Sequence, residues 1–312
     1  MLKWYKNLKK GFSALAPMAG ITNSAFRRVC KSFGVDVLYS EMISATALKY
    51  NDEKTVELMQ FNKSESPYVV QLFGNNPKHF SIATKYIAKH IKPDAIDINF
   101  GCPVLKVIKQ GAGIALFEDL KRSRSVIEAT INASELPVFI KTRAQVKDID
   151  VLRFLDNIND LDVKTIMIHG RTASGGFSGP VDTNIIKKAR DYFGGLLIAN
   201  GGVKDYDSYT KLLEDTQADG IGIGQGALGR PWIFKAIRTG QSVERSQCAV
   251  FKAAFVHAKL AEELKGETGI IEMRKHLCWY VQGLPGAKKM REQLVQVESL
   301  GDIMSIIKKC EI

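Results

Sequence analysis

The sequence predicts an α/β fold, a (β/α)8 TIM barrel followed by a small all-helical C-terminal domain. Short β-rich runs recur eight times, helical patterns lie between them, and no strand-like run follows residue 240. Strands that alternate with helices pair in parallel, and eight such units in about 240 residues are typical of this barrel. We therefore expect the barrel over 1–240 and the helical domain over 241–312, closely packed because no low-complexity linker separates them.

The expected strands are apolar runs that end in glycine or polar residues. They cover 12–20, 37–44, 68–74, 95–103, 138–143, 165–172, 196–203 and 220–228. Among the segments between them, 22–34 begins with a Thr-Asn pair typical of a helix N-cap, and 76–91 carries Pro77 in its first turn. Beyond the barrel, 246–266, 268–283 and 288–310 all have helical periodicity.

Composition narrows the class of protein. The chain has 312 residues, 45% of them hydrophobic and 25% charged, which is ordinary for a soluble globular protein. Its five cysteines form no CxxC pair and no regular spacing, so we expect a cytoplasmic protein with free thiols and no metal site. Neither an export signal nor an apolar run of about 18 residues is present, so we expect no membrane insertion. A monomer without an obligatory protein partner is the expected state.

Positive charge favours a polyanionic partner. The net charge is +11, with a pI near 9.3. Seven Lys or Arg and no acid occur in 1–35, and five more with no acid occur in 273–291. These clusters are either solvated helix faces or contacts to nucleic acid. Trp279 and Tyr280, in the second cluster, are either stacking groups or core residues.

Polar and glycine residues gather where the expected strands end, and in this barrel those ends share one mouth. So many contacts favour a large cofactor over a small metabolite. Glycines after the seventh and eighth strands are typical of a phosphate site, and FMN is the cofactor that fits best. Lys141 can stabilise negative charge on a reduced flavin, and Gln71 offers a donor and an acceptor to the ring. The alternatives are a structural ion pair for Lys141 and a packed, hydrogen-bonded His169.

A single thiol, Cys102, lies on the loop after the strand of 95–99, between Gly101 and Pro103. A lone cysteine is most often a small buried hydrophobic residue. Its place at the C-terminal end of a barrel strand nevertheless makes it a candidate catalytic group.

Nine segments together resemble the tRNA-dihydrouridine synthase family. They are APMAGITNSAFR, SEMISA, QLFG, DINFGCPVLKVIKQGAG, FIKTR, HGRT, ANGGV, GALGRPWIF and EMRKHLCWYVQGLPGA. The resemblance runs from about Phe12 to Leu294, and the segment around Cys102 is its most specific part. It implies an FMN-containing barrel with a helical tRNA-binding domain that reduces particular uridines of tRNA, with NADPH as the electron donor.

The resemblance also implies roles for individual residues. The residues expected to hold the cofactor are Ala16, Pro17, Met18, Gln71, Lys141, His169, Asn200, Gly201, Gly202, Gly224 and Gln225. Asn99 would read the target uracil, and Lys106, Arg171, Arg274 and Lys275, with Lys288, Lys289 and Arg291, are candidate tRNA contacts. If reduced FMN delivers hydride to C6 of the uracil, Cys102 would give the proton to C5, because a thiol with a pKa of about 8.5 is protonated near neutrality.

Three positions depart from the pattern of the family. Gly202 stands where many members have an acidic residue, and Gln225 stands where they have Arg, so a charged contact from position 225 to the phosphate is in doubt. Ala173 replaces a basic residue that often follows HGRT. The modified uridine and the preference for NADPH over NADH stay open.

Two alternatives stay open as well. One is a flavin barrel that acts on a free pyrimidine or another small enone, and the other is a catalytically silent RNA-binding barrel. The first would have activity on free uracil or uridine, and the second would be colourless.

Overall fold

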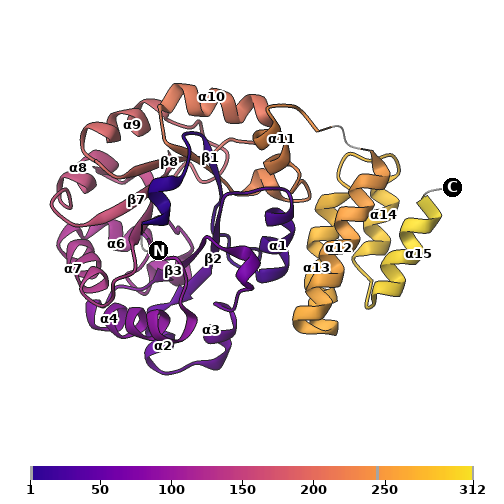
Figure 1. The fold of residues 1–312 in the computed structure, drawn as a ribbon, viewed down its shortest axis with the longest axis horizontal. Helices are drawn as coiled ribbons and strands as arrows, with labels where there is room; N and C mark the ends of the chain where they lie inside the picture. The colour runs from indigo at the N-terminus through magenta and orange to yellow at the C-terminus, as the bar shows by residue number, and fades with distance from the viewer. Residues whose placement is uncertain (1–2, 244–245, 311–312) are drawn as a thin grey trace.

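The computed structural model describes residues 3–243 and 246–310. Eight parallel strands form a sheet that closes on itself, because β4 pairs with both β3 and β5 (Figure 1). The eight strands are β1 (Phe12–Leu15), β2 (Val37–Ser44), β3 (Tyr68–Phe73), β4 (Ala95–Asn99), β5 (Val138–Val146), β7 (Val163–Thr172), β8 (Leu196–Asn200) and β9 (Gly220–Ile223). The predicted (β/α)8 barrel is confirmed, and each expected run overlaps one of these strands, although β5 extends beyond 138–143 and β7 begins before 165. A short strand, β6 (Ile149–Asp150), was not expected and forms a hairpin with β5.

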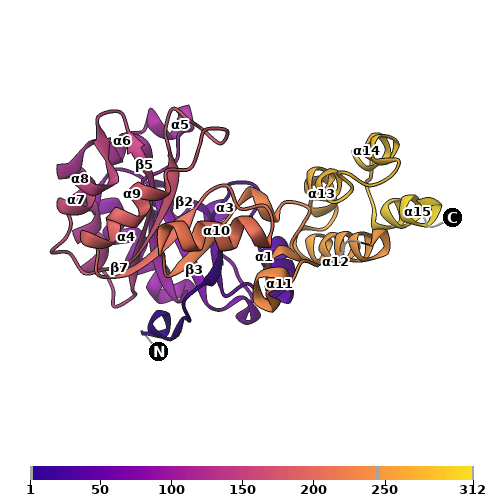
Figure 2. The ribbon, with the colours of Figure 1, turned by 90° about the horizontal axis from the view of Figure 1, so that it is seen from above.

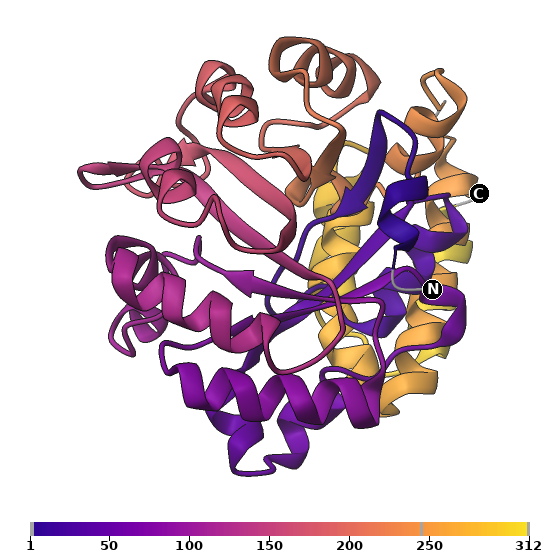
Figure 3. The ribbon, with the colours of Figure 1, turned by 60° about the vertical axis from the view of Figure 1, so that its left-hand side comes forward.

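Helices cover the outside of the barrel (Figure 3). They are α1 (Ser24–Ser32), α2 (Ala45–Lys49), α3 (Glu53–Glu57), α4 (Pro77–Tyr86), α5 (Leu105–Ile108), α6 (Ile114–Glu118), α7 (Leu120–Ile131), α8 (Val151–Asp156), α9 (Thr183–Lys188), α10 (Tyr206–Thr216) and α11 (Ile233–Thr239). Two expected helix starts are confirmed. The N–H of Phe26 donates to the Asn23 side chain at 3.0 Å, which caps α1, and Pro77 is the first residue of α4.

The inside of the barrel changes from apolar to polar along the strands. Side chains alternate between the two faces of a strand, so every second residue points inward. Near the strand starts the interior holds Phe12, Tyr39 and Phe139, and Tyr5 of the N-terminal 3-10 helix η1 (Trp4–Asn7) packs edge-on against Phe139. The inward positions that follow Phe139 on β5 are Lys141 and Arg143. The barrel is therefore filled with apolar groups at one end and carries its charges at the other.

Four helices follow the barrel and lie to one side of it (Figure 2). They are α12 (Gln247–Lys265), α13 (Glu267–Tyr280), α14 (Ala287–Leu294) and α15 (Leu300–Cys310). The predicted helical segment 288–310 is thus two helices. Ser299 starts the second, because the N–H of Asp302 donates to its hydroxyl at 3.1 Å while its own N–H donates to the Asp302 carboxylate at 2.9 Å. No helix among the described residues is long and apolar enough to cross a membrane.

The barrel meets the C-terminal helices through α1. Phe26 stacks on His257 of α12, with ring centroids 5.4 Å apart, and Ala25 belongs to the apolar core of the C-terminal helices. These apolar and aromatic contacts agree with the close packing that we expected because no low-complexity linker separates the barrel from the C-terminal helices. The division of the chain near residue 240 stays a prediction.

A buried ion pair in α1 yields a stability prediction. Arg27 and Glu65 are both fully buried, 2.5 Å apart, and the Arg27 guanidinium also donates to the carbonyls of Thr22 and Gln60. Replacement by Arg27→Met leaves the Glu65 carboxylate buried without its partner, so we expect the free energy of unfolding to fall by about 3–5 kcal/mol. Urea denaturation measures the change.

The neighbouring substitution Arg28→Met is the matched control. Arg28 is one-third exposed and lies 3.7 Å from Glu263, so its removal should cost less than about 1 kcal/mol. Equal losses for the two variants would contradict a special role of the buried pair.

Candidate active site

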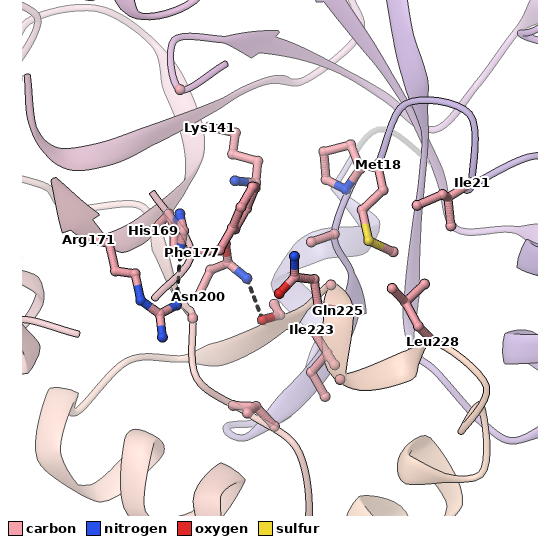
Figure 4. Close-up of a pocket in the computed structure, with 18 of the residues that line it drawn as sticks. Met18, Ile21, Lys141, His169, Arg171, Phe177, Asn200, Ile223, Gln225 and Leu228 are labelled. Carbon is pink, nitrogen blue, oxygen red and sulfur yellow. Dashed lines mark hydrogen bonds between the residues drawn. The ribbon is translucent and has the colours of Figure 1, made fainter. Parts of the chain in front are cut away.

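A cavity of about 630 Å³ opens at the C-terminal mouth of the barrel (Figure 4). Six of the strands contribute to its wall, and Trp279 of α13 lines it from the C-terminal helices. Thirteen of the expected site residues line it: Ala16, Pro17, Met18, Asn99, Cys102, Lys141, His169, Arg171, Asn200, Gly201, Gly202, Gly224 and Gln225. The other seven, Gln71, Lys106, Arg274, Lys275, Lys288, Lys289 and Arg291, do not. A cavity of this size at this end of the barrel can hold a ligand as large as a mononucleotide cofactor.

The pairing of the strands places the polar side chains around this mouth. Asn99 of β4 pairs with Lys141 of β5, and His169 of β7 pairs with Arg143 on one side and Asn200 on the other. Figure 4 shows Lys141, His169 and Asn200 on one side of the cavity, with Met18 and Gln225 on the other. Residues distant in the sequence are thus brought to one level of the barrel.

The loop that carries Cys102 is held in place by hydrogen bonds to its backbone. The Asn99 side-chain oxygen accepts the N–H groups of Gly101 and Cys102 at 3.0 and 2.9 Å. The carbonyl of Cys102 accepts the N–H of Ile114 at 3.2 Å, and a Cβ on Gly113, whose φ is +61°, would lie only 2.5 Å from that carbonyl. Only glycine is therefore suited to position 113, where the loop is clamped.

The Cys102 thiol is held in its neutral form. It lines the cavity but is only 8% exposed, and this burial raises its pKa above the usual value. The N–H of Val104 and the charges of Arg143 and Lys141 oppose the rise without reversing it. A protonated thiol can donate a proton, and the same neighbours would stabilise the thiolate that remains.

Two basic residues of the wall have lowered pKa values. Burial, with the charge of Arg143, lowers the pKa of Lys141 to about 8, so the ammonium group is still mostly charged at neutral pH. Burial and the charges of Lys141, Arg143 and Arg171 lower the pKa of His169 to about 2, which keeps the imidazole neutral. Within the described part of the chain no acceptor bonds the Lys141 ammonium. It is therefore free to meet an anionic ligand.

Glycines line the cavity beyond β8 and β9. Gly201 and Gly202 have φ values of +120° and +78°, which favour glycine. The backbone N–H groups of Gly201, Gly202, Gly224 and Gln225 have no protein acceptor among the residues described here. Free N–H groups in such a cluster are suited to phosphate oxygens.

Positive charge near the glycines comes from residues that the sequence did not single out. The Gln225 side chain is exposed and neutral, whereas Lys204 and Arg230 also line the cavity. Hydrogen bonds from Ser208 lower the pKa of Asp205 at the start of α10, and the charges of Lys204 and Arg230 lower it further, so both cations lie near that carboxylate. The site thus holds cations that the Gln at position 225 does not supply.

Arg143 joins two loops at the mouth, a role that sequence reasoning missed. Its guanidinium donates to the Gly101 carbonyl at 2.9 Å and to the carbonyls of Thr172 and Gly176 at 3.0 Å. It therefore ties the Cys102 loop to the loop after β7. The signal was present in the sequence, since Arg143 is the next inward position after Lys141 on β5.

Aromatic side chains at the mouth come from two different parts of the chain. Phe177, on the loop after β7, is 59% exposed and lines the cavity. Trp279 also lines it, whereas its neighbour Tyr280 is fully buried in the core of the C-terminal helices. Tyr280 is therefore a core residue, whereas stacking by Trp279 stays a prediction.

The candidate tRNA contacts have different environments. Lys106 is exposed on α5, and Arg171 lies beside His169, with 3.2 Å between nitrogens. Arg274 donates to the Val297 carbonyl at 2.9 Å, and Lys275 donates to the Gly20 carbonyl at 2.5 Å. Arg171 also donates to the Gly179 carbonyl, so three of these four side chains make contacts within the protein. Lys275 links α13 to the loop after β1.

Comparison with known proteins identifies the family. The family model described as dihydrouridine synthase (Dus) matches residues 14–310. The chain belongs to the dihydrouridine synthase family. It is 32% identical over 311 residues to a probable tRNA-dihydrouridine synthase of Aquifex aeolicus, covering 98% of each chain. It is 28% identical to tRNA-dihydrouridine synthase B of Pseudomonas aeruginosa, over 91% of this chain and 88% of that one.

The chain also resembles solved structures with the same barrel, but at a much lower sequence identity than its family relatives. TcOYE with pHBA has a TM-score of 0.55 at 10% identity, covering 78% of this chain and 94% of that one. The old yellow enzyme homologue of Zymomonas mobilis has a TM-score of 0.52 at 10% identity, covering 77% and 91%. These similarities show a shared fold.

The buried thiol yields a prediction for alkylation. Because burial raises the pKa of Cys102, iodoacetamide should modify it slowly at pH 7, with a rate that rises with pH and is half-maximal above about pH 8.5. Mass spectrometry of the peptide that contains Cys102 measures the rate. Cys248, which is exposed, serves as the control in the same sample. A half-maximal rate below pH 8 would show that the thiol is activated and not held neutral.

Proposed function

We propose that this family member reduces specific uridines of tRNA to 5,6-dihydrouridine, with bound FMN as cofactor and NADPH as the electron donor. The observation that carries the proposal is the Cys102 thiol, held neutral in the same cavity as the Lys141 ammonium and the free N–H groups of the glycines. Relatives that match nearly the whole chain are named tRNA-dihydrouridine synthases, which supports the substrate class.

The residues of the cavity fit FMN. The free N–H groups of Gly201, Gly202, Gly224 and Gln225, which follow Asn200 and Ile223 at the ends of two strands, would hold its phosphate, with Lys204 and Arg230 adding positive charge. The residues that would contact the ring and ribityl region are Ala16, Pro17, Met18, Lys141 and His169. Gln71 is fully buried beneath the wall and would act through Asn99.

Lys141 and His169 suit a ring that gains negative charge on reduction. The unpaired ammonium of Lys141 would stabilise that charge, and the neutral imidazole of His169 adds no second positive charge beside Lys141, Arg143 and Arg171. When bound, FMN would supply the hydride for C6 of the uracil, and NADPH would restore the reduced cofactor.

Cys102 would give its proton to C5 of the uracil. The S–H bond breaks, the C–H bond at C5 forms, and the sulfur keeps the electron pair as a thiolate. The Val104 N–H, Arg143 and Lys141 all favour that thiolate, which would take a proton from solvent before the next turnover. Asn99, at the base of the same loop, would hydrogen-bond the uracil.

The tRNA must place an unstacked base in the cavity, since its target atoms cannot be reached within a stack. Lys106 and Arg171 on the barrel, and Lys288, Lys289 and Arg291 on α14, would contact the phosphates, with Arg274 and Lys275 as further candidates. Such contacts make affinity fall steeply with salt. Phe177 offers an exposed ring for stacking at the rim.

The first experiment is the visible spectrum of the purified protein. We expect flavin absorption that bleaches when NADPH is added without oxygen and returns when unmodified tRNA is added. Free uridine in place of tRNA is the control and should not restore it. Restoration by free uridine would favour a small-molecule reductase, and a colourless protein that FMN does not reconstitute would contradict the proposal.

Substitution of Cys102 tests its role in catalysis. We expect Cys102→Ala to lower the rate of dihydrouridine formation by about 10²- to 10⁴-fold, because a general acid contributes that much. The flavin content and its reduction by NADPH should stay normal. Cys248→Ala removes an exposed cysteine outside the cavity and is the matched control. Full activity of Cys102→Ala would exclude the thiol as the proton donor.

A further inference from the structure

A chain of side-chain hydrogen bonds lies beneath the cavity wall. The Gln71 side-chain nitrogen donates to Asp97 Oδ2 at 2.5 Å, and the Asn99 side-chain nitrogen donates to Gln71 Oε1 at 2.8 Å. Asn99 Oδ1 in turn accepts the N–H groups of Gly101 and Cys102. The strand register brings the chain together, because Gln71 of β3 pairs with Asp97 of β4. Asp97 is thus connected to the backbone of Cys102 through two amides.

The direction of every bond in the chain follows from the chemistry of its end groups. Backbone N–H groups can only donate, so the atom of Asn99 that meets them must be its oxygen. The nitrogen of Asn99 therefore faces Gln71, which must present its own oxygen. The nitrogen of Gln71 is then left for Asp97, whose carboxyl oxygen accepts. The orientations of the Gln71 and Asn99 amides therefore both require a hydrogen-bond acceptor at position 97.

The same orientation determines what Asn99 offers to the cavity. Its nitrogen also approaches Met42 Sδ at 3.1 Å, and both residues line the cavity. A thioether is a weak acceptor, so a carbonyl oxygen of a bound uracil would be a better partner for that N–H. A flipped Asn99 would instead present oxygen to a uracil carbonyl and would lose both bonds to the Cys102 loop.

We propose that Asp97 is a positioning residue, which fixes the amides of Gln71 and Asn99 so that Asn99 donates to a uracil carbonyl while its oxygen holds the Cys102 loop. The inference rests on the proposed reduction of uridine. Asp97 lies at the far end of the chain, fully buried and outside the cavity lining, so it touches neither substrate nor cofactor.

The environment of Asp97 argues against a role in stability alone. Its other oxygen, Oδ1, has no hydrogen-bond partner among the described residues, and the same holds for the buried Tyr39 hydroxyl. Burial raises the pKa of Asp97 to about 7, against the opposing effects of Gln71 and Lys141. A buried carboxyl with one unsatisfied oxygen is unfavourable for folding. Oδ2 can accept from Gln71 whether or not Oδ1 carries a proton, so the chain keeps its direction in both states.

The test separates the acceptor of Asp97 from its charge. Asp97→Asn keeps an acceptor oxygen for Gln71 and removes the charge, whereas Asp97→Val removes both. Thr165→Val is the matched control, because Thr165 is also buried in the barrel, its hydroxyl has no partner among the described residues, and it does not line the cavity. Stopped-flow absorption follows two steps of the flavin-loaded protein without oxygen, reduction by NADPH and reoxidation by tRNA.

The expected result is a selective effect on the second step. Asp97→Val should slow reoxidation by tRNA about 100-fold, the loss typical of a small misplacement of reacting groups. Flavin content, reduction by NADPH and thermal stability should stay close to those of Thr165→Val. Asp97→Asn should restore most of the rate, which a role in folding or through charge would not predict.

Three results would overturn the inference. They are a normal reoxidation rate in Asp97→Val, an Asp97→Asn rate as low as that of Asp97→Val, or an equal loss in both steps. If Asp97→Val does not fold, the variant Gln71→Met replaces it in the test, because it removes the amide between Asp97 and Asn99 and leaves Asp97 in place. Slow reoxidation of Gln71→Met by tRNA would support the inference, and a normal rate would overturn it. Failure of tRNA to reoxidise the unmodified protein would instead overturn the proposed function.

Discussion

The pairing of β4 with β5 is the constraint on which the site depends. It closes the barrel and sets Asn99 beside Lys141, with Ile98 beside Ile140. Because side chains alternate, the isoleucines face the outer helices while Asn99 and Lys141 face the interior. A slip of one residue in the pairing would exchange the two faces. The isoleucines would then point into the barrel, and a lysine would be buried under the outer helices. The apolar face therefore enforces the register that the polar face needs.

The polar end of the barrel is unfavourable for folding by itself, and the apolar core makes it possible. Lys141 has no acceptor and Asp97 has an unsatisfied oxygen among the described residues, which are features that a structure built for stability alone would avoid. The large outer cluster of buried Ile, Val, Leu and Phe provides the opposing stability. Unpaired charge in a cavity is then available to a ligand.

Periodicity predicted the architecture because a strand with two different faces repeats every two residues, and all eight strands have that signal or a buried apolar run. It could not predict partners. Gln71 bonds Asp97 and Asn99, and Arg274 and Lys275 bond backbone carbonyls, while their contacts to cofactor and tRNA stay predictions. Such contacts join residues up to 255 positions apart, and no local pattern in a single sequence encodes them.

The C-terminal helices also form part of the site. Trp279 of α13 lines the cavity, and Gly229 packs so tightly on it that an added Cβ would lie 2.3 Å from the Trp279 carbonyl. Lys275 of the same helix bonds the Gly20 carbonyl, while the N–H of Gly20 donates to the buried Glu41. The loop that follows Ala16–Met18 is thereby held between β2 and α13. Helix α13 therefore both lines the cavity, through Trp279, and holds the loop after β1, through Lys275, so the shape of the mouth depends on how the C-terminal helices pack on the barrel.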